Sequence, residues 1–77
     1  MNEVLEKIKE LRIYQEKALL KLGRKFVPSL TSDDILQPND FVELELNPHF
    51  RYEEGLLHGI QSVEAALQAL ESEIKSK

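Results

Sequence analysis

The chain has no cysteine and no tryptophan, and it contains only three glycines, three prolines and five aromatic residues. Without cysteine there is no disulfide framework and no thiolate metal site. No apolar run approaches the roughly 20 residues that a membrane helix needs. Residues 1–10 alternate charged and apolar side chains and lack the apolar segment of a signal peptide. We therefore expect a soluble, cytoplasmic protein with no membrane contact.

The chain is short, and its 77 residues allow one domain at most. A compact chain of this size buries roughly 60–65% of its unfolded surface. The ordering cost of about 1.5 kcal/mol per residue nearly cancels what that burial supplies. Small folds usually add disulfides, metals or partners. Because cysteine is absent, we expect the extra burial to come from self-association or from another protein.

Charge is unevenly spread along the chain, whose net charge is −4. Residues 1–27 hold seven basic and four acidic side chains, whereas residues 28–77 hold three basic and ten acidic ones. Two halves of opposite charge that fold onto each other explain this split. The alternative is a basic helix that contacts nucleic acid. Glutamates interleave with the lysines of that helix, which favours the first interpretation, since nucleic-acid binders usually carry a dense basic stripe.

The last thirty residues contain an uninterrupted heptad pattern, in which apolar side chains alternate spacings of four and three. Asn47 and Pro48 precede it, and an Asn cap followed by Pro at the first helical position is a strong helix start. We predict a helix over about residues 48–75. The apolar row is Leu56, Ile60, Val63, Leu67, Leu70 and Ile74. A parallel row of small residues is Gly55, Gly59, Ser62, Ala66 and Ala69.

The small row predicts close helix packing, because two glycines inside a helix cost about 1 kcal/mol each relative to alanine. A further helix is predicted over about residues 2–22, with Gly23 as a stop that needs positive φ. Continuation to Val27, before Pro28, stays open. Its main apolar row is Val4, Ile8, Leu11, Ala18 and Leu22, with Gln15 in the remaining position and with Leu5, Leu19 and Phe26 on one side.

Some apolar side chains of the first helix lie away from that row. Ile13 and Leu20 are seven residues apart on the far side, with Tyr14 nearby. A helix that meets one partner rarely carries such residues there. We therefore expect a second element of the chain, or another subunit, to cover them.

The connection over residues 23–47 is too long for a simple turn. Ser32 is a candidate cap for one helical turn over 32–36, and residues 37–40 carry a turn signal. Residues 41–46 fit either an extended segment or a short helix capped by Asp40. We expect Phe41 and Leu44 to pack on the hairpin. The alternative is a partly exposed groove that these two residues form with Tyr52 and Leu57 for another protein's helix.

Candidate chemistry is sparse. Glu54 and His58 share a helix face, and His49 and Glu53 lie one to two turns earlier, but a metal site needs three or four ligands and the first helix has no histidine. No nucleophile–base arrangement and no phosphate-binding loop is present in the sequence. We therefore expect neither a metal site, nor a cofactor, nor enzymatic activity.

The sequence as a whole predicts an all-α antiparallel helical hairpin with an ordered connection containing one or two short helical turns, assembling into a multi-helix bundle. We expect a protein–protein interaction module, such as an adaptor, an assembly factor or a small chaperone, that binds itself or another helical protein. A regulatory protein that contacts nucleic acid through the first helix is the alternative. The predicted interface residues are Ile13, Tyr14, Leu20, Phe41, Leu44, Gly55, Gly59 and Ala66.

Overall fold

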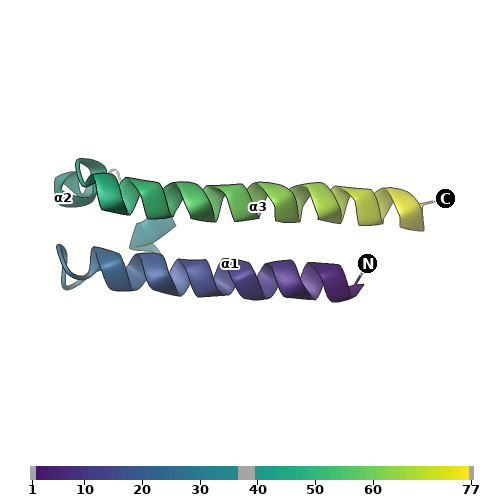
Figure 1. Cartoon of the computed structure of the whole chain (residues 1–77), viewed down its shortest axis with the longest axis horizontal. Coiled ribbons are helices and arrows are strands. Elements are labelled where there is room, and N and C mark those ends of the chain that lie inside the picture. Colours follow the sequence, from purple (N-terminus) through teal and green to yellow (C-terminus); the bar gives the residue numbers. More distant parts are fainter. Residues whose placement is uncertain (1, 37–39, 77) are drawn as a thin grey trace.

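A computed structural model describes residues 2–36 and 40–76. The chain folds as an antiparallel hairpin of two long helices, α1 (Asn2–Gly23) and α3 (Pro48–Lys75), as Figure 1 shows. Between them lie a short 3₁₀ turn, η1 (Asp34–Leu36), and a one-turn helix, α2 (Val42–Glu45). The described residues contain no strand. The predicted all-α hairpin with short helical turns in its connection is therefore confirmed.

The start of α3 follows the predicted capping chemistry. Asn47 occupies the N-cap, its side-chain oxygen accepts from the Phe50 amide at 2.9 Å, and Pro48 takes the first helical position. The side chain thereby satisfies one of the amides that the first turn leaves without an intrahelical partner. The next residues of α3 bring Phe50 into the core, where it is fully buried.

The predicted cap Ser32 is wrong, and of the two alternatives for residues 41–46 the short helix forms, without Asp40 as its cap. Thr31, rather than Ser32, caps the 3₁₀ turn: its hydroxyl accepts from the Asp34 amide at 3.3 Å, and Asp34 accepts from the Thr31 amide at 2.9 Å. This reciprocal pair satisfies two backbone donors at once. Helix α2 begins after Phe41, which makes no side-chain cap, so Asp40 does not cap it. Most of the turn predicted over residues 37–40 lies outside the described residues.

Gly23 ends α1, but not for the predicted reason, because no described glycine has positive φ. The chain leaves the helix through a tight turn in which the amides of Phe26 and Val27 donate to the Gly23 carbonyl at 3.0 and 2.9 Å. A Cβ at Gly23 would lie 2.5 Å from Leu30 Cδ2 and 3.2 Å from Phe50 Cε2. Glycine is required here because the connection and α3 approach the backbone closely.

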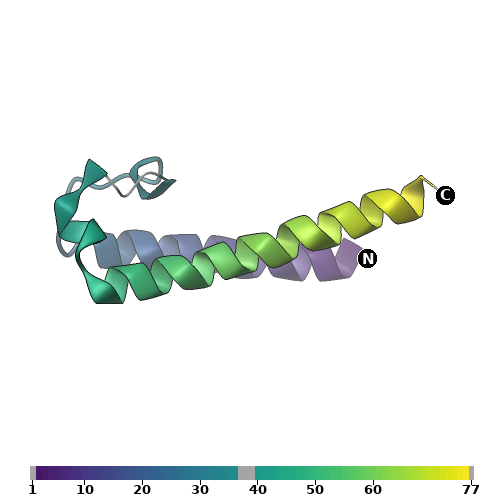
Figure 2. The same cartoon turned by 90° about the horizontal axis from the view of Figure 1, so that it is seen from above.

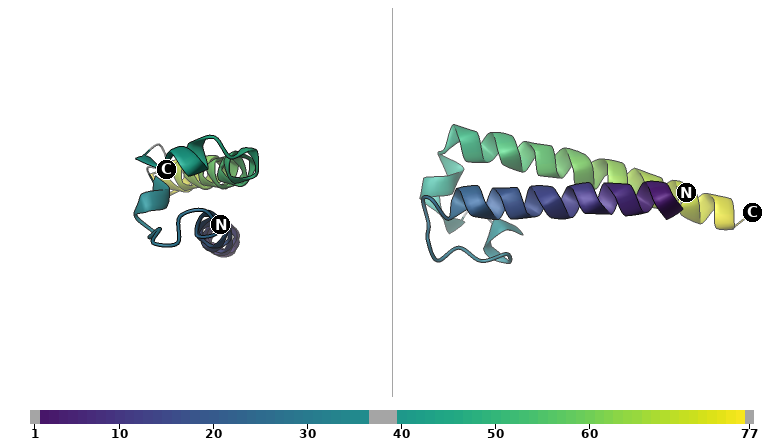
Figure 3. Two further views of the ribbon diagram at one scale, coloured as in Figure 1. Left: turned by 90° about the vertical axis from the view of Figure 1, so that its left-hand side faces the viewer. Right: turned by 60° about the horizontal axis from the view of Figure 1, so that its bottom comes forward.

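The core lies at the end of the hairpin where the chain turns, which we call the turn end. The connection folds back over one side of the helix pair, as Figures 2 and 3 show, so three layers meet there. Leu20, Val27 and Phe41 pack at the edge of this core. Its fully or nearly buried members are Leu19, Leu22, Leu30, Ile35, Leu44, Phe50 and Leu57.

The opposite half, which holds both termini and which we call the open end, consists of α1 and α3 alone (Figures 1 and 3). The molecule is elongated, with extents of 48 × 19 × 18 Å and a radius of gyration of 14.8 Å. A compact chain of this length has a radius of about 11 Å. The hairpin therefore leaves more side-chain surface in contact with solvent than a compact fold does.

Candidate interaction face

Two polar contacts bridge α1 and α3 near the middle of the hairpin. In the first, the Arg12 guanidinium donates to Glu64 of α3 at 2.8 Å and to Glu16 of its own helix at 2.6 Å. The hydrogen bond to Glu16 is the main cause that raises the pKa of Arg12; partial burial opposes the rise and the charge of Glu64 adds to it. The guanidinium stays charged and ties the two helices in one register.

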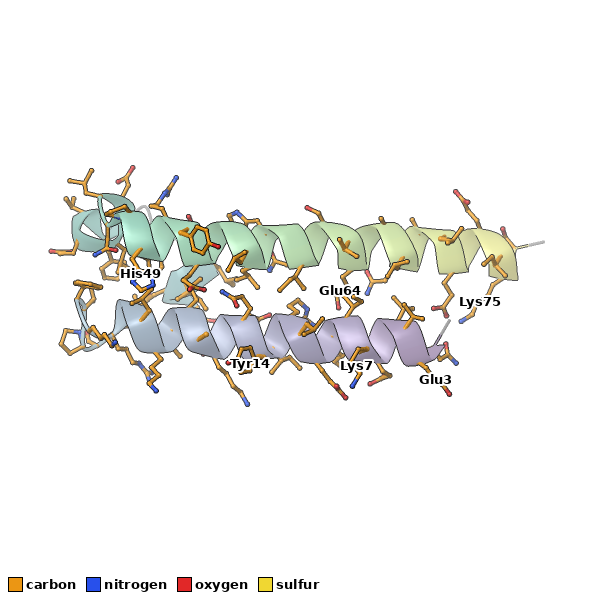
Figure 4. The ribbon with its side chains drawn as sticks, viewed as in Figure 1. Glu3, Lys7, Tyr14, His49, Glu64 and Lys75 are labelled. Carbon is orange, nitrogen blue, oxygen red and sulfur yellow. The ribbon has the colours of Figure 1, made fainter. Side chains whose placement is uncertain are left out.

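The second contact lies one turn closer to the turn end. The buried Gln15 amide donates to the Glu53 backbone carbonyl at 3.1 Å and to its carboxylate Oε2 at 2.7 Å. The other carboxylate oxygen of Glu53 lies 3.8 Å from His49 Nε2. In Figure 4, His49 and Glu64 project from α3 toward α1. A polar residue within a helix–helix contact specifies register, so Gln15 and Arg12 together fix which rows of α1 face α3.

This orientation turns part of each apolar stripe away from the other helix. On α1, the rows that begin at Leu5 and Ile8 and recur every seven residues face α3, and they include Arg12 and Gln15. Val4 and Leu11 belong to the next row and are each 47% exposed. On α3, Ile60 and Leu67 are half-buried between the helices. The neighbouring row of Leu56, Val63 and Leu70 is 42–49% exposed.

These outward rows form one exposed surface on the side of the hairpin away from the connection, which passes behind the two long helices in Figure 1. At the open end, Val4 lies beside Ile74 of α3 around one hollow. Toward the turn end, Tyr14 and Ala18 share a second hollow with His49. We call this surface the open face. It comprises Val4, Leu11, Leu56, Val63, Leu70 and Ile74, with Tyr14 and Tyr52 at its edges.

A row of charged side chains follows the edge of α1 beside the open face. Its first half carries Glu3, Glu6 and Glu10, its second half carries Lys17 and Lys21, and Lys25 follows in the turn just after the helix ends. All six side chains are exposed. Figure 4 shows Glu3, Lys7 and Tyr14 along this helix. Lys7 lies in the first half and forms an exposed ion pair with Glu10 at 3.0 Å. With three glutamates and one lysine along this edge, the first half has a net negative charge, and the second half has a net positive charge.

The predicted interface residues do not lie together. Leu44 is fully buried in the core, and Phe41 and Leu20 pack at its edge. The connection therefore covers Leu20. This agrees with the first of the two predicted alternatives, in which a second element of the same chain covers the apolar residues that lie away from the main row of α1. Ile13 is 37% exposed and Tyr14 is 72% exposed. The alternative groove with Tyr52 and Leu57 does not form within the chain, because Leu57 is buried while Tyr52 is exposed.

Gly55, Gly59 and Ala66 lie on the outer side of α3, where all three are exposed. A Cβ at Gly55 or Gly59 would meet nothing within 4 Å. Helix α1 therefore does not approach the small row, and close packing there stays a prediction about another chain. Gly59 and Ala66 each follow an open-face residue, Leu56 or Val63, by three positions and so border the open face.

The candidate metal ligands make pairs rather than a cluster. His49 pairs with Glu53 as described, and Glu54 is buried and lies 3.3 Å from Arg51 Nη1. His58 is exposed. Within residues 2–36 and 40–76, no three His, Asp or Glu side chains lie close enough to hold a metal ion together. In the same residues, no helix is both long and apolar enough to cross a membrane.

Val4, Leu11, Leu56 and Val63 belong to the main apolar rows of the sequence, and the structure leaves them 42–49% exposed. The width of the apolar stripes is the signal for this exposure. Helix α1 carries apolar residues in three neighbouring rows, and α3 carries two full rows besides Phe50 and Leu57, whereas contact between two helices alone uses about two rows.

No protein-family model, curated protein or solved structure matches this chain. The interaction face is therefore interpreted from its own side chains.

Proposed function

We propose that the protein is a helix-pairing interaction module whose open face binds an apolar helical surface of another polypeptide chain. One observation carries this proposal: apolar side chains recur every seven residues on two adjacent helices and are left about half exposed. Partner helices in coiled coils insert their side chains between rows of this spacing. Contiguous exposed apolar surface on a small protein also marks an interaction site. An adaptor, an assembly factor or a small chaperone would use such a face.

Photo-crosslinking tests the proposal. A photoreactive phenylalanine analogue replaces Val63, in the middle of the open face, and in a matched control it replaces Ala65. Ala65 is also exposed, and two residues along a helix it points to the far side of α3. We expect irradiated cells to yield crosslinked polypeptide, either a second copy or another protein, from position 63 and not from position 65. Equal products from both positions, or none from position 63, would overturn the proposal.

A second candidate function is binding of nucleic acid, supported by the hollow that Lys17, Lys21 and Lys25 line together with Tyr14 and His49. Glu53 lines the same hollow, and the acidic half of the α1 edge repels phosphate. We therefore rank it second. Binding of an RNA oligonucleotide that weakens with added salt and with Lys21→Gln would favour this candidate over the first.

A further inference from the structure

We propose that the occupant of the open face is a second copy of this chain, packed antiparallel so that α1 lies on α1 and α3 lies on α3 in a four-helix bundle. The inference rests on the proposed function and names its partner. It is drawn from three features of the helices that carry the open face: the symmetry of the charges beside it on α1, the symmetry of the small residues on the outer side of α3, and the level at which the two helices face each other.

The charges along the edge of α1 are self-complementary. Glu3 and Lys25, Glu6 and Lys21, and Glu10 and Lys17 are each placed symmetrically about Ile13 and Tyr14. When two copies of α1 run antiparallel with Tyr14 near the two-fold axis, each glutamate meets a lysine of the second copy. In a parallel pair, glutamates would meet glutamates and lysines would meet lysines. Charges that flank a helix–helix contact set the orientation of the pair in this way.

The small residues along α3 are symmetric about a point of their own. Gly55 and Ala66 are placed symmetrically about Ile60 and Gln61, and so are Gly59 and Ser62. Two antiparallel copies of α3 that cross at this point would bring glycine opposite alanine and glycine opposite serine. Small side chains on both sides allow the helix axes to approach closely, and the space beside the two glycines is empty within the chain.

The two symmetry points lie at nearly the same level of the hairpin. The bridging contacts Arg12–Glu64 and Gln15–Glu53 join residues 12–15 of α1 to residues 53–64 of α3. Tyr14 therefore lies opposite the middle of the small row. One two-fold axis, perpendicular to the helices, can satisfy both the charges of α1 and the small residues of α3. Had the points lain at different levels, no single symmetric dimer could use both.

The size of the open face fits a stable dimer. With extents of 48 × 19 Å, the outline of one whole side of the hairpin is at most roughly 900 Å², so most of that side has to take part to reach about 800 Å² per partner, as in a standard specific interface. The face carries the exposed Leu, Val, Ile and Tyr side chains, and the charges lie at its edge. An apolar centre with a polar rim is the usual anatomy of a stable interface.

The solution mass is the first test. Sedimentation equilibrium at micromolar concentration should give twice the 8.9 kDa of the chain. Val63→Glu, which puts a charge in the centre of the face, should return the mass to that of one chain with helix content retained, while Ala65→Glu on the far side should remain dimeric. A wild-type monomer at all concentrations up to about 1 mM would overturn the inference, because no stable homodimer has so weak a Kd.

Charge exchange is the second test, and it probes the orientation. In one variant Glu3, Glu6 and Glu10 are all changed to Lys; in the other Lys17, Lys21 and Lys25 are all changed to Glu. Each alone places like charges along the α1–α1 contact, so we expect its dimer Kd to rise about tenfold or more. An equimolar mixture should restore association, because every flanking contact then pairs Lys with Glu. The single variants test the orientation, because a parallel wild-type pair would already oppose like charges: an unchanged dimer Kd in both variants would overturn the antiparallel arrangement. Failure of the mixture to associate better than either variant alone would overturn the pairing of these charges.

Distances between spin labels supply an independent readout, since the chain has no native cysteine. In the antiparallel dimer a label at Tyr14→Cys lies close to its copy, whereas labels at Lys21→Cys, still within α1, are separated along the axis by about 21 Å at 1.5 Å per residue. Equal short distances at both positions would show a parallel dimer and overturn the inference.

Failure of this inference is distinguishable from failure of the proposed function. A chain that remains monomeric but crosslinks to a different protein from position 63 would reject the second copy and keep the interaction module. A chain that remains monomeric and gives no crosslink from position 63 would reject both.

Discussion

The turn end and the open end of this hairpin are made from the same two helices, yet they differ in how completely they are packed. At the turn end, Leu19, Leu30, Leu44 and Phe50 are fully buried. At the open end, Val4, Leu11, Val63 and Leu70 remain about half exposed although they belong to equally regular heptad rows. The difference comes from the connection, which supplies a third layer to one end only. Two helices alone bury only the rows that face each other.

The comparison shows that the single chain buries its core side chains completely at the turn end and leaves apolar side chains half exposed at the open end. Folding of the single chain therefore depends mainly on the turn end, and the association proposed above would depend on the open face. Substitutions at the two ends should separate these properties.

Phe50→Ala should have the largest effect on folding. It removes the largest fully buried side chain of the turn end, and truncating a buried Phe costs about 3–5 kcal/mol. That is much of the total stability of a domain this size, roughly 4–12 kcal/mol. The matched change at the open end, Val63→Ala, removes a side chain that is 49% exposed and should cost less than about 1 kcal/mol.

Urea unfolding followed by circular dichroism, at concentrations where the chain is monomeric, measures both changes. The difference between the two losses of unfolding free energy compares the contributions of the two ends to folding. Similar losses for Phe50→Ala and Val63→Ala would mean that the open end contributes to folding as much as the turn end does, against the packing described here.

Gly23→Ala should also destabilise the turn end, by about 1–2 kcal/mol. The new methyl group would lie within 3.2 Å of Phe50 and closer still to Leu30, and both side chains are fully buried in the core, so one of them has to shift. The usual helix preference of alanine over glycine would therefore be outweighed. Thermal melting of Gly23→Ala and of Gly59→Ala provides the comparison, because Gly59 has open space around it and alanine there should raise the melting temperature.

Gly59→Leu should act with opposite signs on folding and on association. In the monomer it replaces a poor helix former at an open position, so stability should rise by roughly 0.5–1 kcal/mol. In the proposed dimer the larger side chain would hold the two α3 helices apart and weaken association. Melting at low concentration and sedimentation at high concentration measure the two effects. A variant that associates as tightly as the wild type would show that no helix packs closely at Gly59.

The sequence was sufficient for the hairpin and for the start of α3, because heptad spacing and the Asn47–Pro48 signal are local. It was not sufficient to predict which apolar row of each helix faces the other helix. The apolar stripes are broad enough to fit several rotations of each helix, and the polar residues Arg12 and Gln15 select one of them through Glu64 and Glu53 of the other helix. Such a choice depends on residues from distant parts of the chain. For the same reason Gly23 was assigned a backbone role, although its neighbours Leu30 and Phe50 explain it.

The smallest expected effect lies at the middle of the hairpin, where the two ends join. A double-mutant cycle of Arg12→Gln and Glu64→Gln should give a coupling energy of about 0.5–1 kcal/mol, because the pair is partly buried and directly hydrogen-bonded. Glutamine keeps most of each side chain and removes the charge. The control cycle of Lys7→Gln and Glu10→Gln concerns a pair whose side chains are 71% and 64% exposed, and it should give almost no coupling. Equal coupling in both cycles would mean that the Arg12–Glu64 bridge does no more than an ordinary surface pair. The rotation of the two helices, and with it the exposure of Leu11 and Val63, would then need another cause.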